Sequence, residues 1–255
     1  MTITFETKVW ENDWEIILKT DRVNQMIERC HHSFSEKVLY INNVSDLKAV
    51  CLAADKLIRK DIITKYVNVE EYAKATMEFF SLSRDKLGKG YYYSIAELVS
   101  IYLTETEYLL HFSGDSIVSE NAPKNWLNEG IKTLQNNPNV KIFNLIWNKK
   151  YKEVKKESQF EDQLNFYGNG FSDQMYLART VELKERIYDH YHPDSERYPV
   201  YGGELFEKRV YSWLRTHSYL RATYKHGSYL HKNFPKTHWK QKLSVLLNSP
   251  NLFNG

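Results

Sequence analysis

Short apolar runs alternate with longer amphipathic stretches through the first 150 residues of the chain. Runs of β-branched and aromatic residues predict strands, and apolar residues three or four positions apart predict helices. The predicted strands are Phe5–Trp10, Lys37–Asn43, Ile62–Val69, Tyr108–Phe112 and Val140–Trp147. Strands that alternate with helices favour one α/β domain with a doubly wound, mostly parallel sheet and right-handed crossovers.

The amphipathic stretches between these strands predict the crossover helices. They run from Asp13 to about Cys30, from an N-cap at Asp46, over Glu70–Phe80 and Ser94–Leu103, and from Pro123 to Asn136. The fourth strand is almost continuously apolar, which predicts that helices cover both of its faces.

The pattern changes after residue 150. The charge run Lys149–Ser158 indicates a solvated linker or loop, and the last hundred residues are rich in Tyr, His, Arg and Lys. We expect this part to form helices and loops packed over the sheet. The chain is thus divided into an α/β half, residues 1–150, and a C-terminal part of the same domain, residues 151–255.

Composition narrows the possible partners. The chain has 255 residues, of which 42% are hydrophobic and 26% charged, and its net charge is only +3. The protein as a whole therefore has no strong electrostatic field that attracts nucleic acid or anionic lipid, and any anion site must be local. Cys30 and Cys51 fit neither a disulfide framework nor a zinc pattern, which predicts free thiols. No apolar run approaches the roughly 20 residues of a membrane span, so we expect a soluble, cytoplasmic protein.

One strand ends in an unusual way. The stretch YLLHFSGDSIVSE, Tyr108–Glu120, is an apolar run that breaks at a carboxylate between small residues. Gly and Asp suit a simple turn, but open α/β sheets also bind their ligands beyond the carboxyl ends of their strands. Polar residues follow the first two predicted strands as well, within Thr7–Asn12 and at Asn42 and Asn43. The three strand ends predict one polar rim.

This arrangement resembles the nucleotide-sugar glycosyltransferases of the GT-A fold, especially family 2. The segment KGYYYSIAELVSIYLTETEYLLHFSGDS, Lys89–Ser116, has their order of glycine-containing loop, helix, acidic turn and apolar strand with an acidic end. The resemblance covers about residues 1–150. It implies a hexosyltransferase of carbohydrate biosynthesis that moves a sugar from a nucleoside-diphosphate donor, held by residues 1–150, to a carbohydrate acceptor, held by residues 151–255.

The resemblance also implies a Mn²⁺ or Mg²⁺ site. In the family an Asp-x-Asp motif carries a divalent cation that offsets charge on the leaving diphosphate. Asp115 matches its second carboxylate, whereas Ser113 stands where the family has the first. By the same resemblance, His231 in a basic C-terminal loop is a second candidate ligand. A lone histidine is more often a surface or packing residue, so that alternative stays open.

Several polar residues are candidates for binding the donor. The resemblance places the nucleotide and diphosphate against Thr7, Glu11, Asn42, Asn43, Ser113 and Gly114. In the loop before the predicted helix Ser94–Leu103, three basic residues are candidates for phosphate or sugar contacts, because basic side chains neutralise such groups. They are Arg84, Lys86 and Lys89. Loop lysines are also common without any such role.

The candidate general base lies in FYGNGFSDQMYLART, Phe166–Thr180. This segment resembles a family motif in which an acid after a glycine-containing turn deprotonates the acceptor hydroxyl. Asp173 takes that position, and Ser172 replaces the acid before it. An N-cap for a following helix explains Asp173 equally well, and Glu204 or Glu207 would then be the base. We expect direct displacement with inversion, although the sequence also allows retention.

Two other functions compete with sugar transfer. A sugar-phosphate nucleotidyltransferase uses a related sheet, but it needs a glycine-rich basic loop after the first strand, where this chain has ENDWEIIL. A non-catalytic nucleic-acid or carbohydrate-binding module suits the aromatic and basic C-terminal third. The acidic residues spread through that third and the small net charge oppose it, so we expect no nucleic-acid partner.

Overall fold

The computed structural model describes residues 1–199 and 202–253. Its strands are β1 Ile3–Val9, β2 Glu36–Ile41, β3 Lys65–Asn68, β4 Tyr108–Phe112, β5 Ser116–Val118, β6 Val140–Trp147, β7 Phe160–Glu161, β8 Asn165–Gly168, β9 Met175–Arg179 and β10 Leu220–His231. Its α-helices are α1 Trp14–Lys19, α2 Arg22–Glu28, α3 Leu47–Arg59, α4 Val69–Phe79, α5 Arg84–Leu87, α6 Tyr91–Leu103, α7 Trp126–Asn136, α8 Tyr151–Glu157, α9 Thr180–Leu183, α10 Phe206–Thr216 and α11 His238–Leu246.

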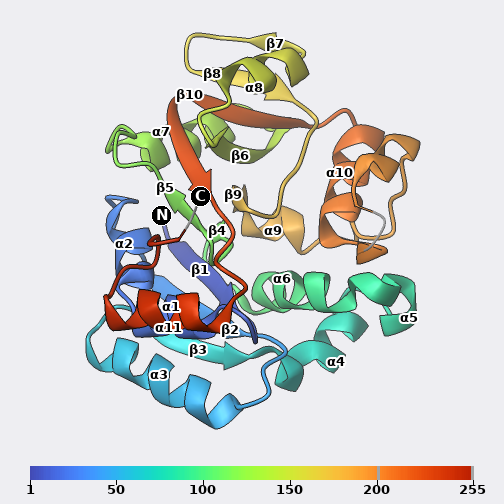
Figure 1. Cartoon of the computed structure of the whole chain (residues 1–255). Helices are drawn as coiled ribbons and strands as arrows, with labels where there is room; N and C mark the ends of the chain where they lie inside the picture. Colours follow the sequence, from blue (N-terminus) through green and yellow to red (C-terminus); the bar gives the residue numbers. More distant parts are fainter. Residues whose placement is uncertain (200–201, 254–255) are drawn as a thin grey trace.

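The strands form one mixed, largely parallel sheet, which confirms the predicted α/β class (Figure 1). Its order is β3-β2-β1-β4-β9-β6-β10-β8-β7, and β5 pairs with β10. All five predicted strands are present as β1, β2, β3, β4 and β6, the last two with the predicted bounds. β1 pairs in parallel with both β2 and β4, so the carboxyl ends of these three strands lie at one edge.

The C-terminal part differs from the expectation of helices and loops. β8, β9 and β10 join the sheet, and β9 runs antiparallel between β4 and β6. The long β10 has an irregularity between Tyr224 and Ser228 that interrupts its alternating pattern, and β9 is short and buried on both faces. Neither strand therefore shows the period-two signal on which the prediction depended.

Two smaller predictions were also wrong in part. The charge run expected to be a linker or loop forms α8, although none of its residues is buried, so its exposure was predicted and its helix was not. The helix expected from Asp13 to Cys30 is divided into α1 and α2. Thr20 adopts an extended conformation between them, and its hydroxyl donates to the Ile16 carbonyl at 2.5 Å.

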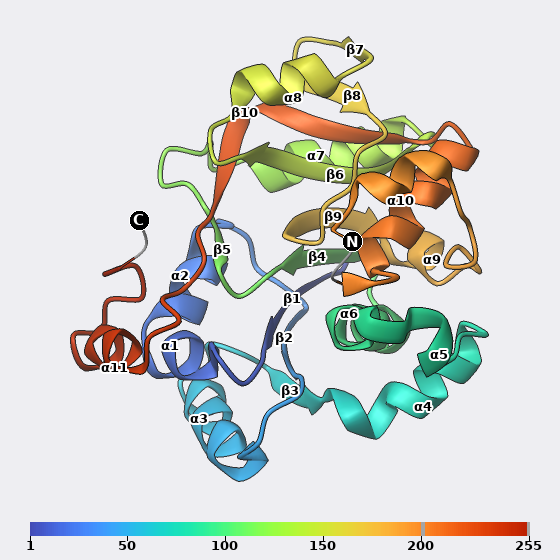
Figure 2. The same cartoon turned by 45° about the vertical axis from the view of Figure 1, so that its right-hand side comes forward.

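Helices cover both faces of the sheet (Figures 1 and 2). Leu109 of β4 packs into a core with residues of α4, α6 and α10, whereas its neighbour Leu110 packs into a second core with α2 and α7. This alternation confirms that β4 is buried on both sides. A third core joins α1 and α3 to β2.

The last helix returns to the N-terminal half. α11 lies beside α1 (Figures 1 and 2), and Gln241 Nε2 donates to the Asn12 carbonyl at 2.8 Å in the loop after β1. Cys30 and Cys51 are free thiols, as predicted. In the part of the chain that the structure describes, none of the helices has the length and apolar character needed to cross a membrane.

Candidate active site

The turn after β4 brings together two residues that are far apart in the sequence. His231 ends β10 and is paired with Ser116 across the antiparallel β5–β10 ladder. Its Nε2 lies 3.2 Å from Oδ2 of Asp115, and both side chains are about one-fifth exposed, 20% and 21%. The Ser113 hydroxyl donates to Asp115 Oδ1 at 2.9 Å. The two predicted metal ligands thus lie side by side at the open edge of the sheet.

The surroundings of Asp115 favour its ionised form. Burial would raise the pKa of this carboxyl, but hydrogen bonds from His231 and Ser113 and the nearby charge of Arg22 outweigh burial and lower the pKa. The carboxylate is therefore available as a ligand at neutral pH.

The spacing of these two side chains fits a divalent cation. Metal–ligand bonds of about 2.0–2.2 Å place neighbouring ligand atoms roughly 3 Å apart, close to the separation of 3.2 Å between Asp115 and His231. Position 113 carries a hydroxyl and not a second, negatively charged carboxylate. Two protein ligands would leave most coordination positions of such a cation to other groups.

A pair of acids lies next to this turn. Asp173 precedes β9, and its backbone N–H donates to Glu207 Oε1 in the first turn of α10 at 2.9 Å. Burial, followed by the neighbouring Asp173 carboxylate, raises the pKa of Glu207 well above its usual value of 4.5. Glu207 therefore retains a proton more readily than an exposed glutamate.

The alternative N-cap role for Asp173 is wrong, because the residues after it form strand β9 and not a helix. Glu204 occupies a different environment from Glu207. Its carboxylate lies 3.3 Å from Lys208 Nζ and 3.2 Å from Arg209 Nε, so two cations already neutralise it.

Backbone pairing joins the acid pair to the turn after β4. Phe112 is paired with Met175 in the antiparallel β4–β9 ladder, and Ser113 N–H donates to the Gln174 carbonyl at 2.9 Å. Asp115 and Asp173 therefore project from adjacent strand ends.

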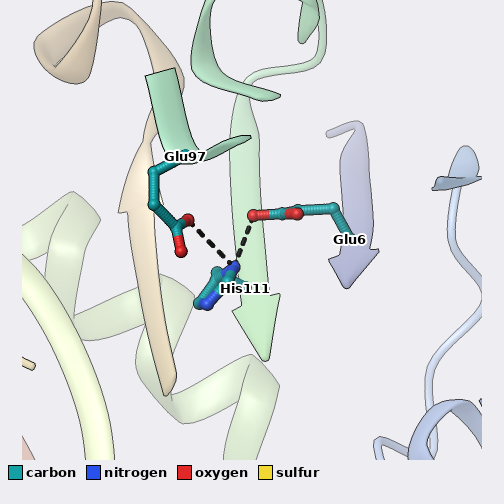
Figure 3. Close-up of side chains that lie close together, drawn as sticks. All are labelled: Glu6, Glu97 and His111. Atoms are coloured by element: carbon teal, nitrogen blue, oxygen red, sulfur yellow. Dashed lines mark hydrogen bonds and ion pairs between the residues drawn. The ribbon is translucent and has the colours of Figure 1, made fainter. Parts of the chain in front are cut away.

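A tetrad of three buried residues, Glu6, Glu97 and His111, and the partly exposed Lys8 lies against the backbone of Asp173 (Figure 3 shows the three buried members). Glu6 and Lys8 occupy alternate positions of β1 and so share a face. His111 Nδ1 lies 2.5 Å from Glu6 Oε1 and 3.4 Å from Glu97 Oε2, and Lys8 Nζ contacts Glu97. His111 Nε2 donates to the Asp173 carbonyl at 2.6 Å. The tetrad thus fixes the backbone of the candidate base.

Sequence reasoning missed this tetrad. Its signal was present as a histidine in the middle of the apolar run YLLHF, because a polar side chain buried on a central strand needs a partner. The 2.5 Å between Glu6 Oε1 and His111 Nδ1 is a hydrogen-bond distance. Glu6, Glu97 and His111 are also close enough together to hold a metal ion.

We expect the tetrad to be important for stability. His111→Leu removes the donor to Asp173 and leaves Glu6, 1% exposed, without its partner. Breaking a buried ionic pair in this way costs about 3–5 kcal/mol. Urea unfolding measures the loss, and Glu78→Gln, from the exposed Lys74–Glu78 pair, is the control with little effect. Equal stability of the two variants would contradict this role.

The predicted donor contacts lie along the same edge but differ in exposure. Glu11 accepts hydrogen bonds from Ser45 N and Oγ at 2.6 and 2.7 Å, which lower the pKa of Glu11 and tie the loops after β1 and β2 together. Asn42 Nδ2 donates to the Tyr92 carbonyl at 2.8 Å, and Asn43 is exposed with a φ of 50°. Thr7 is fully buried and pairs with Phe112 at the end of β4.

The basic loop before α6 lies beside the turn that contains Glu204. Arg84 Nη2 donates to the Tyr92 hydroxyl at 3.0 Å, and Lys86 is paired with Asp189 at 3.4 Å. A side chain at Gly90, next to Lys89, would overlap the backbone of Glu204. Lys89 therefore lies close to the turn of Glu204, and Arg84 belongs to the same loop.

The turn after β4 leaves little room for a side chain at Gly114. A Cβ at Gly114 would overlap the Ile17 side chain and lie 3.0 Å from the Lys8 carbonyl.

The basic C-terminal loop expected around His231 is wrong, because residues 220–231 form strand β10. His226 is exposed there and packs edge-on against Tyr224, and Lys225 is paired with Glu161 at 2.6 Å.

Comparison with solved structures supports the fold. The chain is similar to glucosyl-3-phosphoglycerate synthase from Mycobacterium tuberculosis in complex with Mn²⁺, UDP-glucose and glycerol 3-phosphate, with a TM-score of 0.50 and 14% identity over 98% of this chain and 80% of that one. The same enzyme with phosphoglyceric acid in place of glycerol 3-phosphate gives the same values. S. aureus TarS 1-349 matches with a TM-score of 0.46 and 9% identity over 97% and 65% of the two chains.

In sequence, no family model and no curated protein matches the chain. The structural matches extend over nearly its whole length. The chain therefore has the GT-A glycosyltransferase fold, as the resemblance in its sequence implied.

Proposed function

We propose that this protein is a metal-dependent hexosyltransferase that moves a sugar from a nucleoside-diphosphate sugar to a carbohydrate acceptor. The observation that carries the proposal is that Asp115 and His231 lie 3.2 Å apart. They lie beside the acid pair Asp173 and Glu207, at the edge formed by the carboxyl ends of β1, β2 and β4. Fold alone does not define a reaction. The convergence of a metal-binding pair and a candidate base supports this one.

Asp115 and His231 are the proposed ligands of Mn²⁺ or Mg²⁺. The cation would offset the negative charge that develops on the leaving diphosphate. Glu11, Asn42 and Asn43 follow β1 and β2, where a nucleoside is expected to lie, and Arg84 and Lys89 are the proposed contacts to phosphate or sugar. Ser113 and Gly114 hold the turn that presents Asp115.

Asp173 is the proposed general base. It would accept the proton of the acceptor hydroxyl as the oxygen attacks the anomeric carbon and the diphosphate leaves, which is direct displacement with inversion. Glu207, with its raised pKa, is the proposed holder of a proton beside Asp173. Glu204, paired with Lys208 and Arg209, is the less suitable acid. The acceptor is expected to lie against residues 151–255.

Calorimetric titration with UDP and GDP, with and without Mn²⁺, tests the proposal. We expect one nucleotide to bind, with an affinity at least tenfold higher when the metal is present, because two protein ligands need the diphosphate to complete the metal site. A hydrolysis screen across nucleotide sugars then identifies the donor. Absence of nucleotide binding with any divalent metal, or tight metal-independent binding of an oligonucleotide, would contradict the function.

A further inference from the structure

A cavity of about 300 Å³ lies behind the turn of Asp115. Residues of α2, of β5 and the segment after it, and of the segment after β10 form its walls. Four cationic side chains line it, together with two carboxylates: Arg22, Arg29, Lys149, Lys232, Asp115 and Glu120. Four positive charges minus two negative charges give the lining a formal charge of +2, whereas the whole chain has a net charge of +3.

Arg22 is the most unusual of these side chains, since it is only 1% exposed. Its Nε donates to the Gly114 carbonyl at 3.0 Å, and its Nη1 donates to Asn251 Oδ1 at 3.4 Å. Its Nη2 is buried and has no hydrogen-bond partner in the described part of the chain. A buried charged nitrogen without a partner is costly, so a ligand oxygen here would satisfy it.

The charge of the cavity is available to a ligand. Burial lowers the pKa of Arg22 to about 10, so its guanidinium is still charged at neutral pH. Arg29 is paired with Glu120 at 2.6 Å, which neutralises these two groups against each other. Arg22 and Lys149 are two further cations of the lining, and Asp115 is its other carboxylate.

We propose that this cavity binds a phosphoryl group through Arg22 and Lys149 without a metal ion. A guanidinium with a free N–H beside an ammonium suits the several acceptor oxygens and roughly two negative charges of a phosphate. The phosphoryl group is either part of a nucleoside diphosphate or a monoester carried by another substrate. The proposal rests on the cavity and on Arg22, and it does not depend on sugar transfer.

The test is calorimetric titration of the full chain, in the presence of a chelator, with inorganic phosphate, glycerol phosphate and UDP. We expect saturable binding of at least one of them. Arg22→Met should weaken it at least tenfold. Because Arg22 also holds the Gly114 carbonyl, Lys149→Met is the second variant. Lys149 is exposed, so its loss should spare the core while weakening binding several-fold.

Lys152→Met, an exposed lysine of α8 outside the cavity, is the matched control and should bind as the unchanged protein does. Tighter binding of UDP than of the monoesters identifies the nucleoside diphosphate as the source, and the reverse order identifies a phosphorylated substrate. Binding that requires Mn²⁺ and is lost in Asp115→Asn, equal weakening by Lys152→Met, or no binding at all would overturn the proposal. Binding without any donor turnover would contradict the proposed function alone.

Discussion

Replacing Asp115 with asparagine should reduce metal-dependent donor turnover by about 10³-fold, because several kcal/mol of charge stabilisation at about 1.4 kcal/mol per factor of ten are lost with the carboxylate. The amide keeps the shape of the side chain and removes its charge. Steady-state hydrolysis of the nucleotide sugar identified in the screen, measured over a range of Mn²⁺ concentrations, gives the result.

Two variants separate the charge from the shape of the turn. Ser113→Ala removes the hydrogen bond of 2.9 Å to Asp115 and the hydrogen bond of 2.8 Å to Ser116 Oγ. It should cost about tenfold or less, because one of the two bonds goes to a charged group and the other to a neutral hydroxyl. Asp61→Asn, at an exposed site, should leave turnover unchanged. If Asp115→Asn retains full turnover with the same metal dependence, Asp115 is not a ligand.

Asp173→Asn should lower transfer by about 10²–10⁴-fold, the usual contribution of a general base, while leaving metal-dependent UDP binding intact. The backbone N–H that donates to Glu207 and the carbonyl that accepts from His111 remain in this variant. Transfer to acceptor and nucleotide binding are therefore measured on the same preparation.

Glu207→Gln is the matched variant for the second acid. Its amide oxygen still accepts from Asp173 N–H, so we expect a smaller loss of transfer than for Asp173→Asn. The opposite order would identify Glu207 as the base.

The stability of the protein offers a second measurement, since the pKa of Glu207 is raised above 4.5. Its contribution to unfolding free energy is present below pH 4.5 and is lost as the pH rises through the raised value, and Glu207→Gln should remove that loss.

Much of the α/β half was predictable from the sequence because its strands are local patterns. β4 and β6 are mostly apolar runs, and their bounds follow from the polar residues at both ends. β9 was not predictable in the same way, since its place between β4 and β6 depends on pairings with residues more than 30 positions away. The irregularity at Tyr224–Ser228 concealed β10 for a different reason, because it breaks the alternation on which strand prediction depends.

The candidate site, like the fold, was predictable from the sequence only in part. Asp115 was predicted from its position at a strand end, and the structure brings His231 to it, whereas their roles as ligands remain a prediction. The tetrad was not predictable, because Glu6, Lys8 and Glu97 resemble ordinary exposed charges in the sequence. Only the packing of α6 against β1 and β4 brings them together and buries Glu6 and Glu97, and that packing is a property of the whole sheet.

The late position of β10 in the chain has a consequence for biosynthesis. This strand lies between β6 and β8, and it delivers His231 to a carboxylate that is 231 − 115 = 116 positions earlier. A nascent chain emerging from the ribosome therefore exposes two unpaired strand edges until residues 220–231 are made. We expect the growing polypeptide to require protection from aggregation during this interval. The pair of Asp115 and His231 cannot form before residue 231 has been made.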